Sequence, residues 1–352
     1  MSPRIFILDT YYPDTLARFD RAHPEWPALP YEERLQAVMA ELFGTADFYS
    51  RNLRALGWDA VDIVANYPTL QGPGAMEDVA WRQLNAYAPD VVFLQDFKVL
   101  GPPALAALRA RGVLVAAQLS CSMPEPERMR GADVIFTSFP HYVARLAALG
   151  VRRPVYSPLA CEPTAIDRTL GGSLPPARDL DVLFVGGVGK DVHWRAGTCA
   201  LEALASTYGP RFHWYGYGKG WLEPGSPLHA CYRGEAWGRP MYELLLRAKV
   251  VVNRHGEVAQ GCANNMRLYE ATSAGALLVT EAAYNLGDIF RPGEVATYTT
   301  PETLPAAVDA VLRDWPAYAP RAAATQQRVL AELTYARKMQ QVDAVLREEL
   351  GR

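Results

Sequence analysis

Residues 264–280 read Asn-Asn-Met-Arg-Leu-Tyr-Glu-Ala-Thr-Ser-Ala-Gly-Ala-Leu-Leu-Val-Thr and carry the strongest structural signal in the chain. Asn264 and Asn265 are expected to cap the helix that follows, because asparagine is a favoured N-cap residue. Gly275 interrupts the helix, and the apolar run over residues 276–280 predicts a buried strand. A helix followed by a buried strand is part of a βα series and therefore indicates a parallel α/β sheet.

The same alternation of apolar strands and helices extends through both halves of the chain. The predicted strands are Ile5–Leu8, Ala60–Val64, Val91–Leu94, Val113–Ala117, Val134–Thr137, Val155–Tyr156, Asp181–Val185, Phe212–Tyr215, Val250–Asn253 and Ala276–Thr280. Glycine and proline interrupt regular structure within residues 166–179, which are therefore expected to form a linker. The predicted fold class is α/β, with two Rossmann-like, doubly wound domains that face one another over residues 1–165 and 180–325.

Two helical patterns complete this prediction. The apolar spacing over residues 31–56 predicts one long helix with a break near Gly44. From Trp315 onward the helical pattern is nearly continuous. Its last part, residues 326–352, is expected to cross back and pack on the N-terminal domain.

Composition excludes several classes of partner. The 352 residues carry a formal net charge of −3, so the chain lacks the basic field that nucleic acid or an anionic membrane surface would need. No apolar stretch is long enough to span a membrane, although peripheral membrane contact stays open. The five cysteines form no metal-binding or disulfide pattern, and no signal peptide is apparent, so we expect a cytoplasmic protein.

The first candidate phosphate site follows the strand at Asp181–Val185. Gly186 and Gly187 form a strand-to-helix turn whose backbone amides can cradle an anion, and Lys190 and Arg195 would add positive charge. A tight turn with no ligand role is the alternative.

Arg267 and Glu270 lie one helical turn apart and are expected to project the same way. Arginine at a helix N-terminus suits a diphosphate, and a carboxylate suits a ribose diol. An ordinary surface ion pair is the alternative. We include Asn264, Asn265 and Leu268 in the same expected donor site.

Two further loops follow predicted strands of the C-terminal half. His255 comes after Val250–Asn253 and would bind a phosphate or a donor hydroxyl, unless it is structural. In the aromatic loop at the end of the predicted strand Phe212–Tyr215, Tyr215 or Tyr217 would stack on a nucleobase beside Gly216. A loop that merely packs is the alternative there.

These motifs, continued by Phe290-Arg-Pro-Gly-Glu294, resemble the donor-binding region of GT-B glycosyltransferases. Within them the likeness is to the spore-maturation-protein-like (CgeB-like) group, and it covers roughly residues 180–340. The resemblance implies that Glu270 contacts the donor ribose, and that Arg267 and the Gly186-Gly187 turn approach the diphosphate. The broader retaining families carry a second glutamate eight positions before the ribose-binding one, where this chain has Cys262. Gln260, Asn264 or Asn265 would then replace that contact.

An inverting transfer needs a general base to deprotonate the acceptor hydroxyl. Polar residues that follow strands of the N-terminal half supply three candidates, in the order Asp96, His141 and Asp9. Each of them could instead be structural.

The sequence thus predicts a glycosyltransferase that moves a sugar from a nucleotide diphosphate donor, UDP- or GDP-linked, to an acceptor hydroxyl. We expect no metal and no other cofactor, because cationic side chains can replace Mg²⁺ at the diphosphate. The acceptor stays open among a glycan, a lipid-linked saccharide, a protein and a small molecule. The alternatives are a catalytically silent nucleotide-sugar-binding partner subunit and a nucleotide-sugar epimerase or hydrolase on the same fold.

Overall fold

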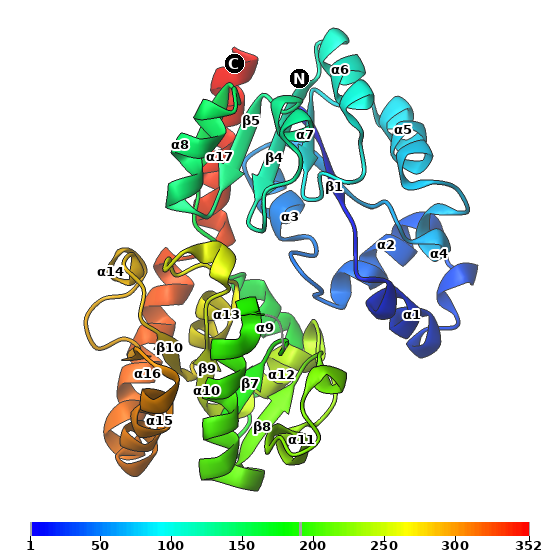
Figure 1. Cartoon of the computed structure of the whole chain (residues 1–352). Coiled ribbons are helices and arrows are strands. Elements are labelled where there is room, and N and C mark those ends of the chain that lie inside the picture. Colours follow the sequence, from blue (N-terminus) through cyan, green and yellow to red (C-terminus); the bar gives the residue numbers. More distant parts are fainter. Residues whose placement is uncertain (1, 190–191, 352) are drawn as a thin grey trace. The chain divides into compact units, whose positions relative to one another are not determined.

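The computed structural model describes residues 2–189 and 192–351, which form two compact units (Figure 1). Unit 1 comprises Met1–Pro158 and Tyr335–Arg352, and unit 2 comprises Leu159–Thr334. The chain therefore passes into unit 2 after Pro158 and returns to unit 1 at Tyr335.

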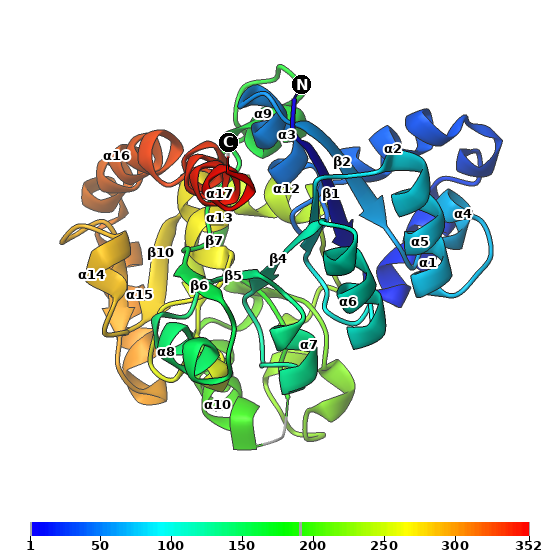
Figure 2. The same ribbon diagram turned by 90° about the horizontal axis from the view of Figure 1, so that it is seen from above.

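Unit 1 contains a six-stranded parallel sheet in the order β2-β1-β3-β4-β5-β6. Strands β2, β1, β4, β5 and β6 of this sheet are labelled in Figure 2. Its strands are β1 Arg4–Asp9, β2 Asp59–Val64, β3 Val91–Leu94, β4 Leu114–Leu119, β5 Val134–Thr137 and β6 Arg153–Tyr156. The central strands are buried along their whole length, which explains why they read as continuous apolar runs. All six strands predicted for this half are confirmed.

Nine α-helices lie in the described part of unit 1. They are α1 Pro13–Ala22, α2 Tyr31–Ala40, α3 Phe48–Ala55, α4 Pro68–Gln71, α5 Met76–Tyr87, α6 Pro102–Ala110, α7 Pro126–Arg130, α8 Pro140–Ala148 and α17 Tyr335–Leu350. The predicted break near Gly44 is confirmed, because α2 and α3 are separated by a loop in which Leu42, Gly44 and Ala46 adopt positive φ.

Helix α17 is built into unit 1. Tyr335 packs on Phe48 of α3, with ring centroids 5.3 Å apart, and the Trp58 indole donates to Asp343 at 2.6 Å. The buried Lys338 ammonium donates to the Ser157 hydroxyl and to the carbonyls of Ser157 and Pro158, at distances of 2.8–3.1 Å. These contacts join the end of the chain to the last residues before the crossing into unit 2.

Unit 2 contains a five-stranded parallel sheet in the order β11-β10-β9-β7-β8. Its strands are β7 Leu180–Val185, β8 Phe212–Tyr215, β9 Ala248–Asn253, β10 Leu277–Glu281 and β11 Ala296–Tyr298. The four strands predicted here are confirmed. Strand β11 has only three residues, too few for a periodic pattern to stand out from a loop.

The α-helices in the described part of unit 2 are α9 Pro163–Leu170, α10 Val192–Tyr208, α11 Leu228–Cys231, α12 Arg239–Arg247, α13 Arg267–Ser273, α14 Leu286–Ile289, α15 Leu304–Arg313 and α16 Trp315–Glu332. Residues 166–179, expected to form a linker, lie within this unit. Arg178 ties them to it by donating to the carbonyls of Ala248 and Ala274 at 2.6 and 2.8 Å.

The two sheets share one strand order. In each, the first strand along the chain lies between the second and the third, so the direction of winding reverses between the first and third strands. This switch point lies between β1 and β3 in unit 1 and between β7 and β9 in unit 2. Ligands of open α/β sheets bind at the carboxyl ends of the strands beside such a point.

Candidate functional site

In unit 2 the loops after β7 and β8 are locked together. The Gly186 amide donates to the Tyr215 carbonyl at 2.9 Å, and the Val188 amide donates to the Tyr217 carbonyl at 3.0 Å. A Cβ atom on Gly216 would lie 2.0 Å from the Gly186 carbonyl oxygen, so the close approach requires glycine there. Two of the amides expected to cradle phosphate are therefore already engaged.

Positive charge reaches this turn from β9. Arg254 follows that strand and donates from Nη2 to the Gly187 carbonyl at 2.8 Å. Burial lowers the pKa of Arg254. Of the cations predicted after β7, Arg195 is exposed on α10, whereas Lys190 lies outside the described residues.

Arg267 and Glu270 form a buried ion pair at the start of α13. Arg267 Nη1 lies 2.8 Å from Glu270 Oε2, and the two side chains are only 13% and 7% exposed. Burial raises the pKa of Glu270, and the Arg267 charge opposes that rise. Arg267 Nε is buried without a hydrogen-bond partner among the described residues. The prediction that these side chains project the same way is confirmed, and an ordinary surface pair is excluded.

The predicted asparagine cap is wrong. The N-cap residue of α13 is Met266, and its side chain makes no capping hydrogen bond to the described residues. Asn265 instead donates from Nδ2 to Asn253 Oδ1 at 2.8 Å and to the Arg254 carbonyl at 2.9 Å, which ties α13 to the end of β9. Asn264 is partly exposed, and Leu268 is fully buried, so Leu268 contributes packing.

His255 is fixed against the end of β10. Its Nε2 lies 3.1 Å from the Glu281 carbonyl oxygen, and its backbone amide donates to Glu281 Oε2 at 3.0 Å. Burial lowers the pKa of His255, so the imidazole is held neutral. Its Nδ1 is buried and has no partner within residues 2–189 and 192–351.

Cys262, which stands where the broader families have glutamate, is fully buried. The loop around it is anchored by Asn285, which accepts from the Ala263 amide at 2.6 Å and donates to the Ala263 carbonyl at 3.3 Å. The position is therefore part of the packed interior of unit 2.

The aromatic loop after β8 presents one of its two candidate tyrosines. Tyr217 is 37% exposed and stacks on Trp237, with centroids 6.0 Å apart and planes 15° from parallel. Its ring also lies over the Gly187 backbone, where an added Cβ would be 2.3 Å from the ring. Tyr215 is the less prominent of the two, being the partly buried last residue of β8.

At the switch point of unit 1, Thr10 links two carboxylates. Its backbone amide donates to Asp9 Oδ1 at 2.8 Å, and its hydroxyl donates to Asp96 Oδ2 at 2.6 Å. Asp96 Oδ1 also accepts from the Lys98 amide at 2.8 Å. Both oxygens of Asp96 are thus engaged, whereas one oxygen of Asp9 accepts no hydrogen bond from the part of the chain that the structure describes.

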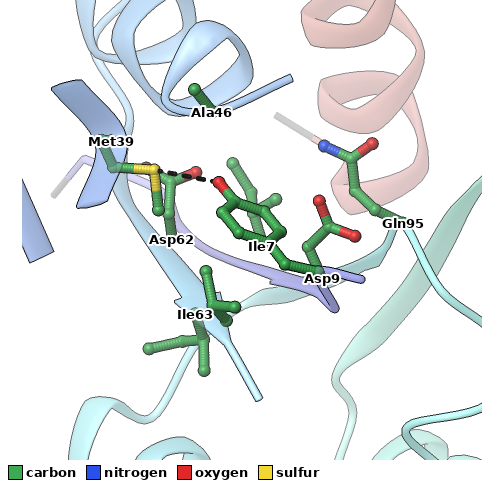
Figure 3. Close-up of a pocket in the computed structure, with 9 residues that line it drawn as sticks. Ile7, Asp9, Met39, Ala46, Asp62, Ile63 and Gln95 are labelled. Carbon is green, nitrogen blue, oxygen red and sulfur yellow. Dashed lines mark hydrogen bonds between the residues drawn. The ribbon is translucent and has the colours of Figure 1, made fainter. Parts of the chain in front are cut away.

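Asp9 borders a cavity about large enough for one water molecule, together with Tyr11, Asp62 and Gln95 (Figure 3). Burial raises the pKa of Asp9 to about 7, and the nearby charges of Asp96 and Asp62 act in the same direction. Burial likewise raises the pKa of Asp62 to about 7, although the Ser50 hydroxyl donates to it.

His141, the other predicted catalytic residue of unit 1, begins α8 among aromatic rings. Its ring centroid lies 5.4 Å from that of Phe139 and 4.8 Å from that of Tyr142. The neighbouring strand ends carry a polar chain in which Gln118 and Ser138 both donate to the Ser120 hydroxyl at 2.8 Å. The sequence pattern predicted polar groups there but not this chain of bonds.

Asp179 and Asp181 form an Asp-x-Asp tripeptide around Leu180. They lie at the amino end of β7, where Asp179 pairs with Arg247 and Asp181 pairs with Arg211 and Lys249. Among the described residues no group of three or more histidine, cysteine or acidic side chains could hold a metal. The search for a membrane-crossing helix over the same residues found none long and apolar enough.

Comparisons with known proteins agree with this geometry. Residues 197–344 match the family described as glycosyl transferase-like. No curated protein matches the sequence.

Solved structures resemble the chain over nearly its whole length. A glycosyltransferase involved in avilamycin A biosynthesis, AviGT4, is 17% identical with a TM-score of 0.64, and sucrose-phosphate synthase from Thermosynechococcus elongatus is 13% identical with a TM-score of 0.62. In both cases 99% of each chain is covered. Anabaena HepE, solved with UDP and glucose, is 14% identical with a TM-score of 0.57, over 98% of this chain and 100% of that one. These likenesses, all at 13–17% identity, establish the GT-B fold, and residues 197–344 within it match the glycosyl transferase-like family.

Proposed function

We propose that unit 2 binds a nucleotide diphosphate sugar and that the enzyme transfers the sugar to an acceptor hydroxyl. The buried Arg267–Glu270 pair carries this proposal. Its guanidinium has an Nε donor that no described residue uses, and Arg267 begins α13 two residues after Asn265, which is bonded to the Arg254 carbonyl at the end of β9. A buried donor of this kind suits a diphosphate oxygen, and the adjacent carboxylate suits the ribose hydroxyls.

The cations of unit 2 would stabilise the leaving nucleoside diphosphate. Arg254 is bonded to the Gly187 carbonyl, Arg267 and the amino end of α10 would add positive charge in the donor site, and the proposal needs no metal. Fixed charges in a buried site need little reorganisation during the reaction. The donor is UDP- or GDP-linked in this proposal, and HepE, which was solved with UDP-glucose, favours UDP for the first trial.

An inverting transfer would draw its general base from the carboxyl edge of unit 1. The contacts favour Asp9 over Asp96 and His141, because both oxygens of Asp96 are occupied, while Asp9 keeps one oxygen that no described residue bonds. A base with a pKa near the working pH is also the most effective. Asp96 would then keep Asp9 basic through its own negative charge.

Two finer assignments belong to the same proposal. The Phe290–Glu294 loop and the Arg267–Glu270 spacing favour the CgeB-like group. The five cysteines are free, which suits the reducing cytoplasm. The acceptor class is still open among glycan, lipid-linked saccharide, protein and small molecule.

A catalytically silent nucleotide-sugar binder is the second candidate. The burial of Cys262 favours the silent binder. The second glutamate of the broader families is missing here, and a buried cysteine at that position cannot replace its contact with the donor sugar. Release of nucleoside diphosphate separates the two functions, since a silent binder never turns the donor over.

The first experiment is a thermal-shift screen with UDP, GDP, TDP, CDP and ADP and their sugar conjugates. A ligand that binds only the folded state raises Tm by mass action. We expect one nucleotide family to raise Tm for the wild type and for Arg313→Ala, an exposed arginine paired with Asp309. Arg267→Ala and Glu270→Ala should lose the shift. Absence of any shift in the wild type would contradict the proposed donor site.

A further inference from the structure

Three side-chain atoms of residues that follow β9 or begin α13 are buried and have no hydrogen-bond partner among the described residues. They are Arg267 Nε, His255 Nδ1 and Asn265 Oδ1. A buried polar atom left unsatisfied costs about 1–3 kcal/mol, so native structures rarely keep such atoms without a ligand or water. Asn265 is bonded to the carbonyl of Arg254, directly before His255, so two of these atoms belong to residues joined at the end of β9 and indicate that a polar ligand completes this region.

The hydrogen-bonding character of His255 Nδ1 follows from the other side of the ring. Nε2 lies 3.1 Å from the Glu281 carbonyl oxygen, which can only accept, and 3.4 Å from the Thr280 hydroxyl, which can accept or donate. The shorter contact assigns the hydrogen to Nε2, with the Thr280 oxygen as a second acceptor. In the neutral imidazole Nδ1 then holds a lone pair and acts only as an acceptor. Burial lowers the pKa of His255, which favours this neutral form even though Glu281 opposes the change.

The character of Asn265 Oδ1 is fixed in the same way. Asn265 Nδ2 faces two acceptors, Asn253 Oδ1 at 2.8 Å and the Arg254 carbonyl at 2.9 Å. Asn253 has its own Nδ2 directed to the Thr280 hydroxyl at 2.9 Å, so its Oδ1 is the atom that faces Asn265. Both hydrogens of the Asn265 amide are used, and Oδ1 is left as an acceptor only.

The three atoms therefore sort into one donor and two acceptors. A diphosphate oxygen satisfies Arg267 Nε but cannot satisfy His255 Nδ1 or Asn265 Oδ1, because a diphosphate diester carries no hydrogen at neutral pH. Hydroxyl groups can donate to both. This sorting narrows the two roles expected for His255, phosphate or hydroxyl, to the second.

We propose that His255 Nδ1 and Asn265 Oδ1 accept hydrogen bonds from hydroxyl groups of the transferred sugar, and that the donor is a sugar with free hydroxyls at the positions they meet. This inference rests on the proposed function. Glu270 is assigned to the ribose, and Cys262 occupies the place of the second glutamate. The transferred sugar therefore has neither of these two carboxylates as a hydrogen-bond acceptor. The two neutral acceptors would take over that contact.

The side chains of His255 and Asn265 are well placed to act together. The Asn265 amide is bonded to the carbonyl of Arg254, the residue directly before His255. Both side chains are oriented by backbone carbonyls, of Arg254 and Glu281, which keeps either from turning to offer a donor instead. Such orientation allows a site to reject analogues that lack the matching hydroxyl.

The test compares calorimetric affinities for UDP and UDP-glucose, and for GDP and GDP-mannose if the guanine nucleotides stabilise the wild type. His255→Phe and Asn265→Leu each remove one acceptor. We expect each to weaken binding of the sugar nucleotide by about 2- to 10-fold, the usual worth of one hydrogen bond, and to change nucleoside diphosphate affinity less than about 2-fold. Asn265→Asp keeps an acceptor oxygen and should retain more of the sugar-dependent affinity than Asn265→Leu.

A second measurement uses the unaltered protein, so that it does not depend on the variants folding. The probes are sugar nucleotides that each lack one hydroxyl of the hexose. At least one of them should bind the wild type about 2- to 10-fold more weakly than the intact sugar nucleotide does. His255→Phe or Asn265→Leu should bind that probe and the intact sugar nucleotide equally well.

Equal losses for the nucleoside diphosphate and its sugar conjugate in both variants would overturn the assignment, as would unchanged affinity for both. If the wild type binds no nucleotide or sugar nucleotide, the proposed function itself fails. If it binds both and no hydroxyl deletion matters, only the hydroxyl assignment fails.

Discussion

The two units have the same strand order but opposite charge at their switch points. Unit 1 places Asp9 and Asp96 after β1 and β3, joined through Thr10. Unit 2 places a glycine turn and Arg254 after β7 and β9, joined through the Gly187 carbonyl. The fold thus provides the position, and the residues that follow each strand provide the chemistry.

The difference suggests a division of labour. A carboxylate with a raised pKa, as at Asp9, can receive a proton, whereas buried guanidinium groups can hold a diphosphate. On this division, changes at the acidic switch point should affect turnover more than donor binding, and changes at the basic switch point should affect both.

Asp9→Asn is expected to give the largest effect. Asparagine preserves the shape of the side chain but cannot take up the proton of the acceptor substrate's hydroxyl group. We therefore expect kcat to fall by about 10²- to 10⁴-fold. The nucleotide-induced Tm shift should be unchanged, because the proposed donor site lies in unit 2. Since burial raises the pKa of Asp9 to about 7, wild-type kcat should rise with pH through that value, and steady-state rates from pH 5 to 9 check this.

Asp96→Asn is the matched control. Removing its negative charge should lower the pKa of Asp9. The rise of kcat with pH should therefore occur at lower pH in this variant than in the wild type, and the loss of kcat should be smaller than in Asp9→Asn. His141→Gln should not change the pH at which kcat rises. If Asp96→Asn or His141→Gln abolishes turnover while Asp9→Asn does not, the base is assigned to the wrong residue.

Arg267→Ala tests the basic switch point and should reduce kcat/KM by about 10²- to 10³-fold, because charge stabilisation of the leaving group is lost. It also leaves Glu270 buried without its partner, which costs about 3–5 kcal/mol of unfolding free energy. The double variant Arg267→Met with Glu270→Met should recover most of that stability without recovering activity. Denaturant titration beside initial rates separates the two effects, and recovered activity would contradict a donor role for the pair.

Asp62→Asn should change stability in a pH-dependent way. The folded-state pKa of Asp62 is raised from 3.8 to about 7, so its contribution favours folding at low pH and is lost as pH rises through 7. A difference of one between the folded and unfolded pKa corresponds to about 1.4 kcal/mol of unfolding free energy. The variant should therefore gain Tm relative to the wild type as pH increases from 5 to 8. A difference in Tm that is constant over this range would show that Asp62 does not titrate there.

Sequence patterns predicted most of the fold because parallel strands buried on both faces read as apolar runs. Val91–Leu94 and Val134–Thr137 are examples whose bounds match the structure. The three-residue strand Ala296–Tyr298 was missed, because so short a run has no period. The helix cap was misplaced because asparagine favours caps in general, whereas Asn265 is drawn to the end of β9 by a contact that is distant in sequence.

The site was predictable in part for the same reason. Spacing within one helix showed that Arg267 and Glu270 would face the same way. Which oxygens of Asp9 and Asp96 are occupied, and which atoms of His255 and Asn265 lack partners in the described structure, depend on contacts between different strand ends. No spacing rule within the sequence encodes those contacts.

The smallest expected effect concerns Cys262, whose side chain packs in the interior rather than lining either switch point. Cys262→Ala should cost about 1 kcal/mol of unfolding free energy through lost packing, and change kcat/KM less than about 3-fold. Cys262→Glu would bury a carboxylate in this packed interior and should destabilise unit 2 by several kcal/mol instead of improving transfer. A Cys262→Glu variant that is stable and has a higher kcat than the wild type would show that the donor sugar reaches this position. The glutamate would then share with Asn265 and His255 the role of hydrogen-bond acceptor for the sugar hydroxyls.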